Sequence, residues 1–286
     1  MDAPLSPSTP TNVWALVAAE LAARRPVVVA TLVRDDGSVP RRAGAKMLVH
    51  PDKRTTGTVG GGLFELLVVR DALAALRQGA SVTRSYSFNP RGTAPDAFGA
   101  VCGGRAEVFY EVVMPADRLL IVGGGHCGRA LAHAASVLNQ FSIVVADDRE
   151  EYARPADYAF PGVEQVLHLP PTFEGLPAAD EQTYVVLVSK GYVTDEAALR
   201  RLIDAPVPYL GMIGSVRKRE VVYDKLRADG IAEEKLARIH APVGLEIGAE
   251  TPEEIAVSIL AQIIQVRAAR KAAAVVPQPA AEDVQV

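Results

Sequence analysis

The chain has 286 residues, of which 49% are hydrophobic, and its formal net charge at pH 7 is −4. This length allows two domains with ordinary buried cores, and the mild acidity argues against a nucleic-acid partner. No apolar run approaches the roughly 18 residues that a membrane span needs, and residues 1–12 have no secretory signal character. We therefore expect a cytoplasmic protein with no membrane partner, whose cysteines, Cys102 and Cys127, are free thiols.

The first part of the chain predicts a small α/β or α+β domain over residues 11–115, after a proline-rich tail at 1–10 that we expect to be disordered. Asn12 is a suitable N-cap for a helix that ends near Arg24. Strands are expected at residues 27–33, 47–50, 82–88 and 106–113, and a second helix is expected at 63–76.

Two segments of this domain have compositions suited to anions. Residues 37–46 form a small, basic, glycine-containing loop, and Gly60, Gly61 and Gly62 come directly before the second helix. Backbone N–H groups at such a helix start can receive an anion. The alternative for the three glycines is a tight turn between closely packed backbones, and the sequence leaves both interpretations open.

A long Gly/Pro/Asp loop at residues 89–99 leads to Cys102. Long loops in compact domains are often functional. Cys102 precedes two glycines and Arg105, whose positive charge favours the thiolate. The alternative interpretation is a small buried residue.

The most informative stretch is residues 119–149. An apolar strand there runs into Gly123, Gly125 and Gly128, a G-x-G-x-x-G pattern that opens a helix, and a second buried strand follows and ends at Asp147. This is the order of a dinucleotide-binding unit, in which the glycines admit a pyrophosphate and the acid bonds a ribose. The alternative is a nucleotide-binding fold that is kept as a scaffold.

Alternating strands and helices continue to about residue 271, which predicts a Rossmann-like, doubly wound parallel sheet over 117–271. Strands are expected at residues 163–169, 183–189 and 208–213, and helices at 195–203, from 216 onward and at 252–271. Ser215 can cap the helix from 216, and Thr251 with Glu254 predicts a capping box at the last helix. Residues 272–286 have the composition of a disordered tail. The predicted fold class is therefore α/β, with a smaller N-terminal domain before the Rossmann-like one.

Ligands of such sheets bind beyond the carboxyl ends of the strands. Three loops are expected at that edge, and they would bring the glycine N–H groups close to Lys190, Ser215 and Arg217, a set suited to phosphate. His126 lies inside the glycine loop, where it would face a ligand and move a proton near neutral pH. The alternatives are a histidine bonded to nearby backbone, and basic side chains that are merely solvated.

Short motifs in both halves of the chain occur in a recognisable order: Gly37–Arg41 through Lys46, Gly60–Gly62 with Glu65, Cys102–Gly104, Val122–Gly128, Asp147–Arg149, Gly211–Ser215 with Lys218 and Arg219, and Ile239–Leu245 through Pro252–Ala256. Taken together, they resemble the XdhC/CoxI family of accessory proteins, which mature molybdenum hydroxylases such as xanthine dehydrogenase. The resemblance extends from about residue 12 to residue 271.

The resemblance implies that the chain binds the molybdenum cofactor (molybdopterin), protects it while a cysteine desulfurase supplies its terminal sulfur, and delivers it to an apo molybdenum hydroxylase. Cys102 is then the candidate contact to molybdenum or to the sulfur atom, since a soft thiolate suits both. The glycine loops and basic side chains would hold the phosphate of the pterin, or a nucleotide attached to it. The role also suggests a homodimer that matches a dimeric client.

One departure from the family pattern lies in the fingerprint, where Gly124 and Cys127 replace a common alanine and valine. Three functions stay open. The first is a cofactor chaperone without turnover and therefore without catalytic residues. The second is an NAD(P)-dependent oxidoreductase, which rests on the glycine pattern and Asp147 but lacks a clear acid/base pair. The third is an assembly scaffold.

Overall fold

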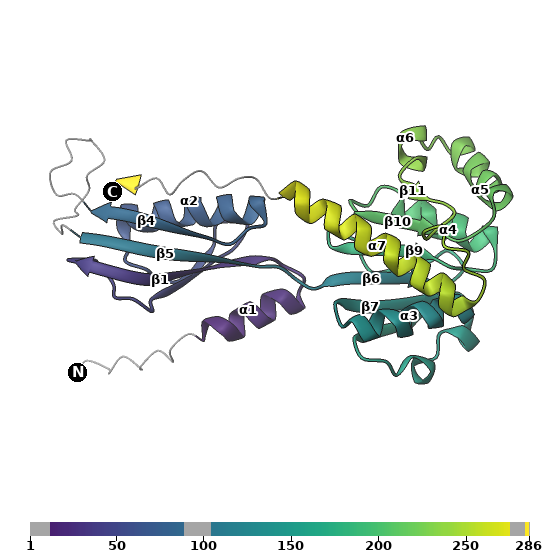
Figure 1. Ribbon diagram of the computed structural model, residues 1–286, viewed down its shortest axis with the longest axis horizontal. Helices are drawn as coiled ribbons and strands as arrows, with labels where there is room; N and C mark the ends of the chain where they lie inside the picture. Colours follow the sequence, from purple (N-terminus) through teal and green to yellow (C-terminus); the bar gives the residue numbers. More distant parts are fainter. Residues whose placement is uncertain (1–11, 89–103, 275–283, 286) are drawn as a thin grey trace, which may run out of the picture. The chain divides into compact units, whose positions relative to one another are not determined.

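The computed structural model describes residues 12–88, 104–274 and 284–285 (Figure 1). The chain forms two compact units, one of residues 1–115 with 271–286 and the other of residues 116–270. Cys102 and the tail expected at 1–10 lie outside the described residues, as do 275–283 of the expected C-terminal tail.

The first unit contains a six-stranded sheet in the order β12-β4-β5-β1-β2-β3. Its pairs are antiparallel, except that the two-residue β12 runs parallel to β4. The strands are β1 Val27–Gly37, β2 Lys46–Val49, β3 Thr55–Gly57, β4 Val82–Phe88, β5 Gly104–Val113 and β12 Val284–Gln285, and the helices are α1 Val13–Ala22 and α2 Gly62–Gln78. The arrangement is therefore α+β, one of the two classes expected for this part of the chain.

The two helices of this unit pack with opposite faces of β1, because successive side chains of a strand point to opposite sides. Val27 and Val29 belong to the buried cluster that includes α1. Val28, Ala30 and Leu32 belong to the larger cluster that includes α2. Burial on both faces explains why this strand is a continuous β-branched run.

The second unit contains a six-stranded sheet in the order β11-β10-β9-β6-β7-β8, and every pairing in it is parallel. Its strands are β6 Asp117–Val122, β7 Phe141–Asp147, β8 Val163–His168, β9 Thr183–Leu187, β10 Tyr209–Met212 and β11 Ile239–His240. Counted along the chain this is the 3-2-1-4-5-6 order of the Rossmann fold, and the direction of winding reverses between β6 and β9. The predicted doubly wound sheet is confirmed.

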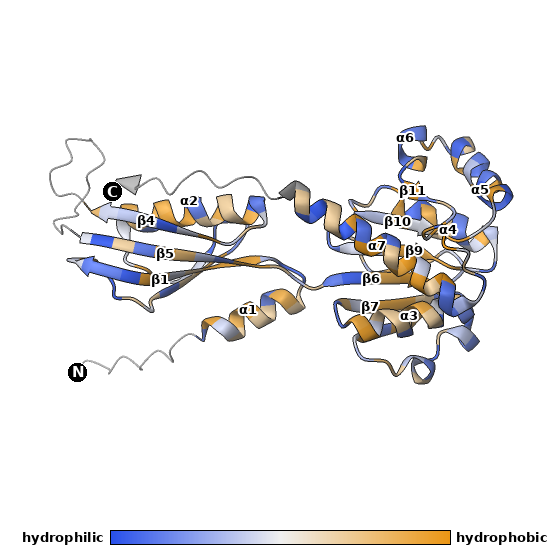
Figure 2. Cartoon of the chain, in the orientation of Figure 1, coloured by the Kyte–Doolittle hydropathy of each residue, from blue (hydrophilic) through white to orange (hydrophobic). Residues whose placement is uncertain are grey.

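Helices cover both faces of this sheet (Figure 1). Both buried clusters contain alternate side chains of β6, β7, β9 and β10. One cluster adds residues of α3 and α7, and the other adds residues of α4 and α5. The helices are α3 His126–Leu138, α4 Tyr192–Leu202, α5 Val216–Ala228, α6 Glu233–Leu236 and α7 Pro252–Ala274, and two 3₁₀ turns, η1 Glu150–Tyr152 and η2 Pro155–Tyr158, follow β7. Strand β7 carries the hydrophobic colour along most of its length (Figure 2), as a strand buried on both faces should.

Three predicted helix caps are present. Asn12 accepts hydrogen bonds from the backbone of Trp14 and Ala15, and the backbone N–H of Lys218 donates to the Ser215 hydroxyl at 3.3 Å. Thr251 and Glu254 form the reciprocal bonds of a capping box, at 3.2 and 3.0 Å.

The prediction missed the short elements β3, α6, β11 and β12 and the turns η1 and η2. β12 lies in the expected disordered tail, where it pairs with β4. The prediction also ended α7 near residue 271, although the helix continues to Ala274. Elements of two to four residues carry too little periodicity to be recognised. Alanine, the best helix former, occupies residues 272–274 and extends α7.

Candidate functional site

The glycines that follow β6 have three different surroundings. Gly123 has a φ of +110°, and a Cβ on it would lie 2.7 Å from the backbone nitrogen of Ser189. A Cβ on Gly128 would overlap the carbonyl oxygen of Gly123, so only glycine lets α3 start this close to the strand end. Gly125 has no atom within 4 Å of such a Cβ, and it precedes α3 without a side-chain cap. The loop thus has the turn, the close packing and the open backbone of a phosphate-binding start.

Asp147, the expected ribose contact, is 1% exposed and bonded within its own loop. Its Oδ2 accepts from the Gly124 backbone at 2.7 Å, and both of its oxygens accept from the Arg149 guanidinium at 3.0 Å. Burial raises the pKa of Asp147, but the bonds from Arg149 and Gly124 outweigh it and hold the pKa below the ordinary carboxyl value. A ribose at this carboxylate would have to replace Arg149.

Two tyrosines from the turns after β7 close over Gly124. The Tyr158 hydroxyl donates to the Gly124 carbonyl at 2.5 Å, and the Arg149 guanidinium lies over the Tyr152 ring, 4.0 Å from its centroid. A Cβ on Gly124 would overlap the Tyr152 carbonyl oxygen. The position of Tyr152 therefore requires glycine at residue 124.

A small cavity of about 150 Å³ lies beside the glycine loop. It is lined by Gly124, Gly125, His126, Arg129, Glu151, Tyr152, Arg154, Asp157 and Tyr158. His126 is exposed there, in contact with solvent. The volume is below the roughly 300 Å³ at which ligand pockets usually begin, so this hollow has room for a small anion but not for a dinucleotide.

Lys190, Ser215 and Arg217 lie in the loops after β9 and β10, at the same edge of the sheet as the glycine loop, and all three are exposed. The Ser215 hydroxyl is occupied as the cap of α5. The set predicted for phosphate therefore lies at the carboxyl edge, and its role in binding stays a prediction.

The same edge contains a buried ion pair that sequence reasoning missed. The Lys218 Nζ lies 2.5 Å from the Asp195 carboxylate, which is fully buried, and it donates to the backbone carbonyls of Ser189 and Ile213. The Ser189 hydroxyl donates to the other Asp195 oxygen at 2.6 Å. Burial raises the pKa of Asp195, while Lys218 and Ser189 oppose that shift.

Helical spacing could have identified Lys218. It precedes Val222 by four residues and Leu226 by eight, and both of these are fully buried. Residues at this spacing share one face of a helix, so Lys218 belongs to the inner face of α5 and Arg217 to the outer face.

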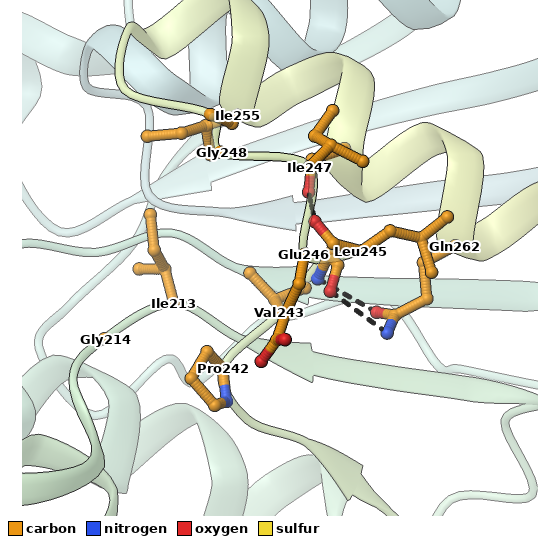
Figure 3. A pocket seen from close by; sticks show the side chains of 13 residues that line it. Ile213, Gly214, Pro242, Val243, Leu245, Glu246, Ile247, Gly248, Ile255 and Gln262 are labelled. Carbon is orange, nitrogen blue, oxygen red and sulfur yellow. Dashed lines mark hydrogen bonds between the residues drawn. The ribbon is translucent and has the colours of Figure 1, made fainter.

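A larger cavity of about 710 Å³ lies where β10 ends (Figure 3). Its walls are the end of β10, the loop 242–249 and the first half of α7. The lining residues are Ile213, Gly214, Pro242, Val243, Gly244, Leu245, Glu246, Ile247, Gly248, Ala249, Ile255, Ser258 and Gln262. Its position beyond a carboxyl strand end is where open α/β sheets bind ligands, although no candidate residue was named in it from the sequence.

In the first unit, Gly60, Gly61 and Gly62 all have positive φ, from +154° to +63°. Glu65 of α2 turns back and accepts from the Thr58 hydroxyl, as well as from the backbone of residue 59 at 3.3 Å. These glycines therefore form a tight turn before the helix. An anion at the same turn stays a prediction.

Among the described residues, no group of three or more His, Cys, Asp and Glu side chains is placed to hold a metal ion. The predicted metal contact, Cys102, lies outside them. Cys127 is half-buried, and burial raises the pKa of its thiol, with Glu253 adding to the shift. In the described parts of the chain, no helix has both the length and the apolar character needed to cross a bilayer.

Comparison with known proteins gives matches in both units. Residues 119–263 match the family model described as the XdhC Rossmann domain, and residues 20–87 match that of the XdhC and CoxI family. A crystal structure described as a xanthine dehydrogenase from Bacillus halodurans superposes with a TM-score of 0.50 at 21% identity, over 92% of this chain and 97% of that one. That likeness shows the fold.

Three curated proteins are also similar. The uncharacterized protein YqeB of Escherichia coli K12 is 39% identical over 85% of this chain and 44% of its own length. A probable xanthine dehydrogenase subunit from Bacillus subtilis is 30% identical over 56% of this chain and 46% of its own length. The chain therefore spans less than half the length of either protein.

The molybdenum cofactor insertion chaperone PaoD of Escherichia coli K12 is 26% identical over 84% of this chain and 83% of its own length. The glycine loop, the strand order and the family matches in both units agree with one another. The chain belongs to the XdhC and CoxI family.

Proposed function

We propose that this chain is an accessory protein of molybdenum hydroxylases. It binds the molybdenum cofactor, holds it while a cysteine desulfurase adds the terminal sulfur, and delivers it to an apo-enzyme of the xanthine dehydrogenase type. It acts in the cytoplasm as a homodimer and has no turnover of its own.

The observation that carries the proposal is the similarity to a molybdenum cofactor insertion chaperone over 84% of the chain. That match covers most of both proteins, so it is not confined to a shared Rossmann unit. The similarity to a probable component of a xanthine dehydrogenase supports a client of the same class.

The residues at the carboxyl edge fit such a cargo. The cavity beyond β10 has about 710 Å³ and mostly apolar walls, which suits a flat heterocycle. The uncapped start of α3 after Gly125 offers backbone N–H groups suited to a phosphate. Cys102 remains the proposed contact to molybdenum or to the sulfur, because a soft thiolate can ligate the metal or carry a sulfur atom.

An NAD(P)-dependent oxidoreductase is less well supported. A ribose would need the Asp147 carboxylate, and that group already bonds Arg149 and Gly124. Calorimetric titration with NAD and NADP, together with a hydride-transfer assay, separates this function from the chaperone.

The proposal is tested by purifying the full chain from a host that makes molybdenum cofactor. We expect about one molybdenum and one pterin per chain, by elemental mass spectrometry and by fluorescence of the oxidised pterin. The substitution Cys102→Ala should lower the molybdenum content severalfold, because the metal loses a thiolate ligand. Cys127→Ala is the matched control and should retain it, since burial raises the pKa of this half-buried thiol and so disfavours the thiolate.

Two outcomes count against these assignments. Wild-type protein that carries neither molybdenum nor pterin refutes the chaperone function. Equal molybdenum content in the wild type and Cys102→Ala removes Cys102 from the site.

A further inference from the structure

The loop after β11 includes part of the stretch that resembles the family pattern, residues 239–245, but no single side chain of it has been given a role so far. This loop forms one wall of the cavity of about 710 Å³. Small-molecule sites commonly have volumes of about 300–1,000 Å³. The cavity therefore has the size and the place in the fold of a ligand site.

The walls are mainly apolar. Ile213 and Ile255 line one side, and Val243 and Leu245 line the loop side, next to Pro242 (Figure 3). A broad apolar surface with few polar groups favours the face of a flat ring over a flexible charged chain.

The loop wall is held rigidly by α7. The backbone N–H of Gly244 donates to the Gln262 side-chain oxygen at 2.9 Å, and the Gln262 amide donates back to the Gly244 carbonyl at 3.3 Å. The Tyr209 hydroxyl donates to the same Gln262 oxygen at 2.6 Å, and the Ser258 hydroxyl donates to the Leu245 carbonyl at 2.9 Å. These bonds join the loop to α7 and β10 and so fix the shape of the wall in advance of any ligand's contacts.

Glu246 is the one charged side chain among the described residues that line this cavity. In Figure 3 its side chain extends away from the loop backbone. No ion pair or hydrogen bond joins that carboxylate to any described residue. Its two oxygens are thus available to accept two parallel N–H bonds, the geometry in which carboxylates meet a guanidinium.

We propose that this cavity binds a 2-amino-4-oxopyrimidine ring, the ring shared by pterins and guanine, and that Glu246 recognises its N–H edge. The ring N3–H and the 2-amino group point the same way and match the two carboxylate oxygens. The apolar walls cover the faces of the ring. The assignment rests on the proposed function, since the molybdenum cofactor contains a pterin and its dinucleotide form can add a guanine.

The test is titration of the full chain with pterin and with guanosine monophosphate, followed by pterin fluorescence and calorimetry. These two ligands distinguish the sources of the ring, and binding of either one supports the site. Glu246→Gln should weaken the binding about tenfold or more, because the amide cannot accept both N–H bonds. Glu250→Gln, in the same segment but outside the cavity, should leave the affinity unchanged.

Two control ligands test whether Glu246 recognises the N–H edge of the ring. Lumazine has a carbonyl in place of the 2-amino group of pterin, and adenosine monophosphate lacks the 2-amino-4-oxo pattern. Lumazine should bind at least tenfold more weakly than pterin, and adenosine monophosphate at least tenfold more weakly than guanosine monophosphate. Glu246→Gln should not lower the affinity for either control ligand further. Equal binding of pterin and lumazine, equal affinity of wild type and Glu246→Gln, or no binding of either pterin or guanosine monophosphate overturns the assignment.

The cofactor content of the purified variants separates this assignment from the proposed function. If the wild type and Glu246→Gln retain equal cofactor, the ring site is wrong and the chaperone function stands. If the wild type carries no cofactor, the chaperone function fails, and the titrations with pterin and guanosine monophosphate decide the ring site independently.

Discussion

Gly125 and Gly128 lie three residues apart in one loop, yet a side chain would meet different surroundings at each. At Gly128 a Cβ would overlap the carbonyl oxygen of Gly123, which is backbone and cannot rotate away. At Gly125 the space within 4 Å is open, and its φ of −68° is accessible to any residue. One glycine is therefore required by packing, whereas the other keeps the backbone open to a ligand.

This difference predicts opposite effects of the same substitution. Gly128→Ala should lower the free energy of unfolding by about 1–3 kcal/mol, the usual cost of overpacking. Gly125→Ala should change it by no more than about 0.5 kcal/mol. Chemical denaturation of the two variants measures both values, and equal destabilisation would show that the loop is not packed as described.

Among the elements, α4 and α5 are joined at the carboxyl edge by the pair of Asp195 and Lys218. Asp195 is fully buried in the first turn of α4, and Lys218 in α5 also bonds the loops after β9 and β10. The pair thus fixes the positions of two loops that border the candidate site.

Removing one partner leaves a buried charge without compensation. Lys218→Met should lower the free energy of unfolding by about 3–5 kcal/mol, whereas Arg217→Met on the exposed face should change it by no more than about 0.5 kcal/mol. Adding Asp195→Asn to Lys218→Met should restore part of the loss. Denaturation midpoints give the three values, and a Lys218→Met variant as stable as Arg217→Met contradicts the role of the pair.

At the scale of the whole molecule, each unit has buried clusters of its own. The described residues of two clusters all come from the second unit, and those of the other two come from the first. Phe64 is central to one of the first unit's clusters, where its ring meets Tyr86 and Phe88 edge-on at 5.2 and 5.1 Å.

A substitution that leaves a cavity at Phe64 should therefore destabilise the first unit only. Phe64→Ala should destabilise the first unit by about 3–5 kcal/mol and speed amide exchange in β1, β4 and β5. Amides of β6 and β7 should keep their protection, because separate cooperative units open separately. Leu66→Ala, on the exposed side of the same helix, is the control. Equal loss of protection in both sheets would show a single cooperative core.

Local sequence signals identified most long elements and their caps. The apolar runs of β6, β7 and β9 and the capping groups Asn12, Ser215 and Thr251 lie where they were expected. Of the candidate site residues, sequence spacing brought the glycine loop, Lys190, Ser215 and Arg217 to one edge of the sheet. The sequence could not show that both oxygens of the Asp147 carboxylate accept hydrogen bonds from Arg149. Those bonds depend on the conformation of the two side chains, which only the folded structure defines.

By itself, the sequence determined the Rossmann half and its glycine turn, since these depend on periodicity and on residues close together in the chain. The family followed from a resemblance of motifs, which the family models confirm. The tertiary structure alone decided the pair of Asp195 and Lys218 and the cavity beside Glu246. Both arise from segments that are distant in sequence and meet only when the parallel strands align their carboxyl ends. The burial of a charged group and the identity of its partners depend on which distant segments come into contact, so no local sequence pattern predicts them.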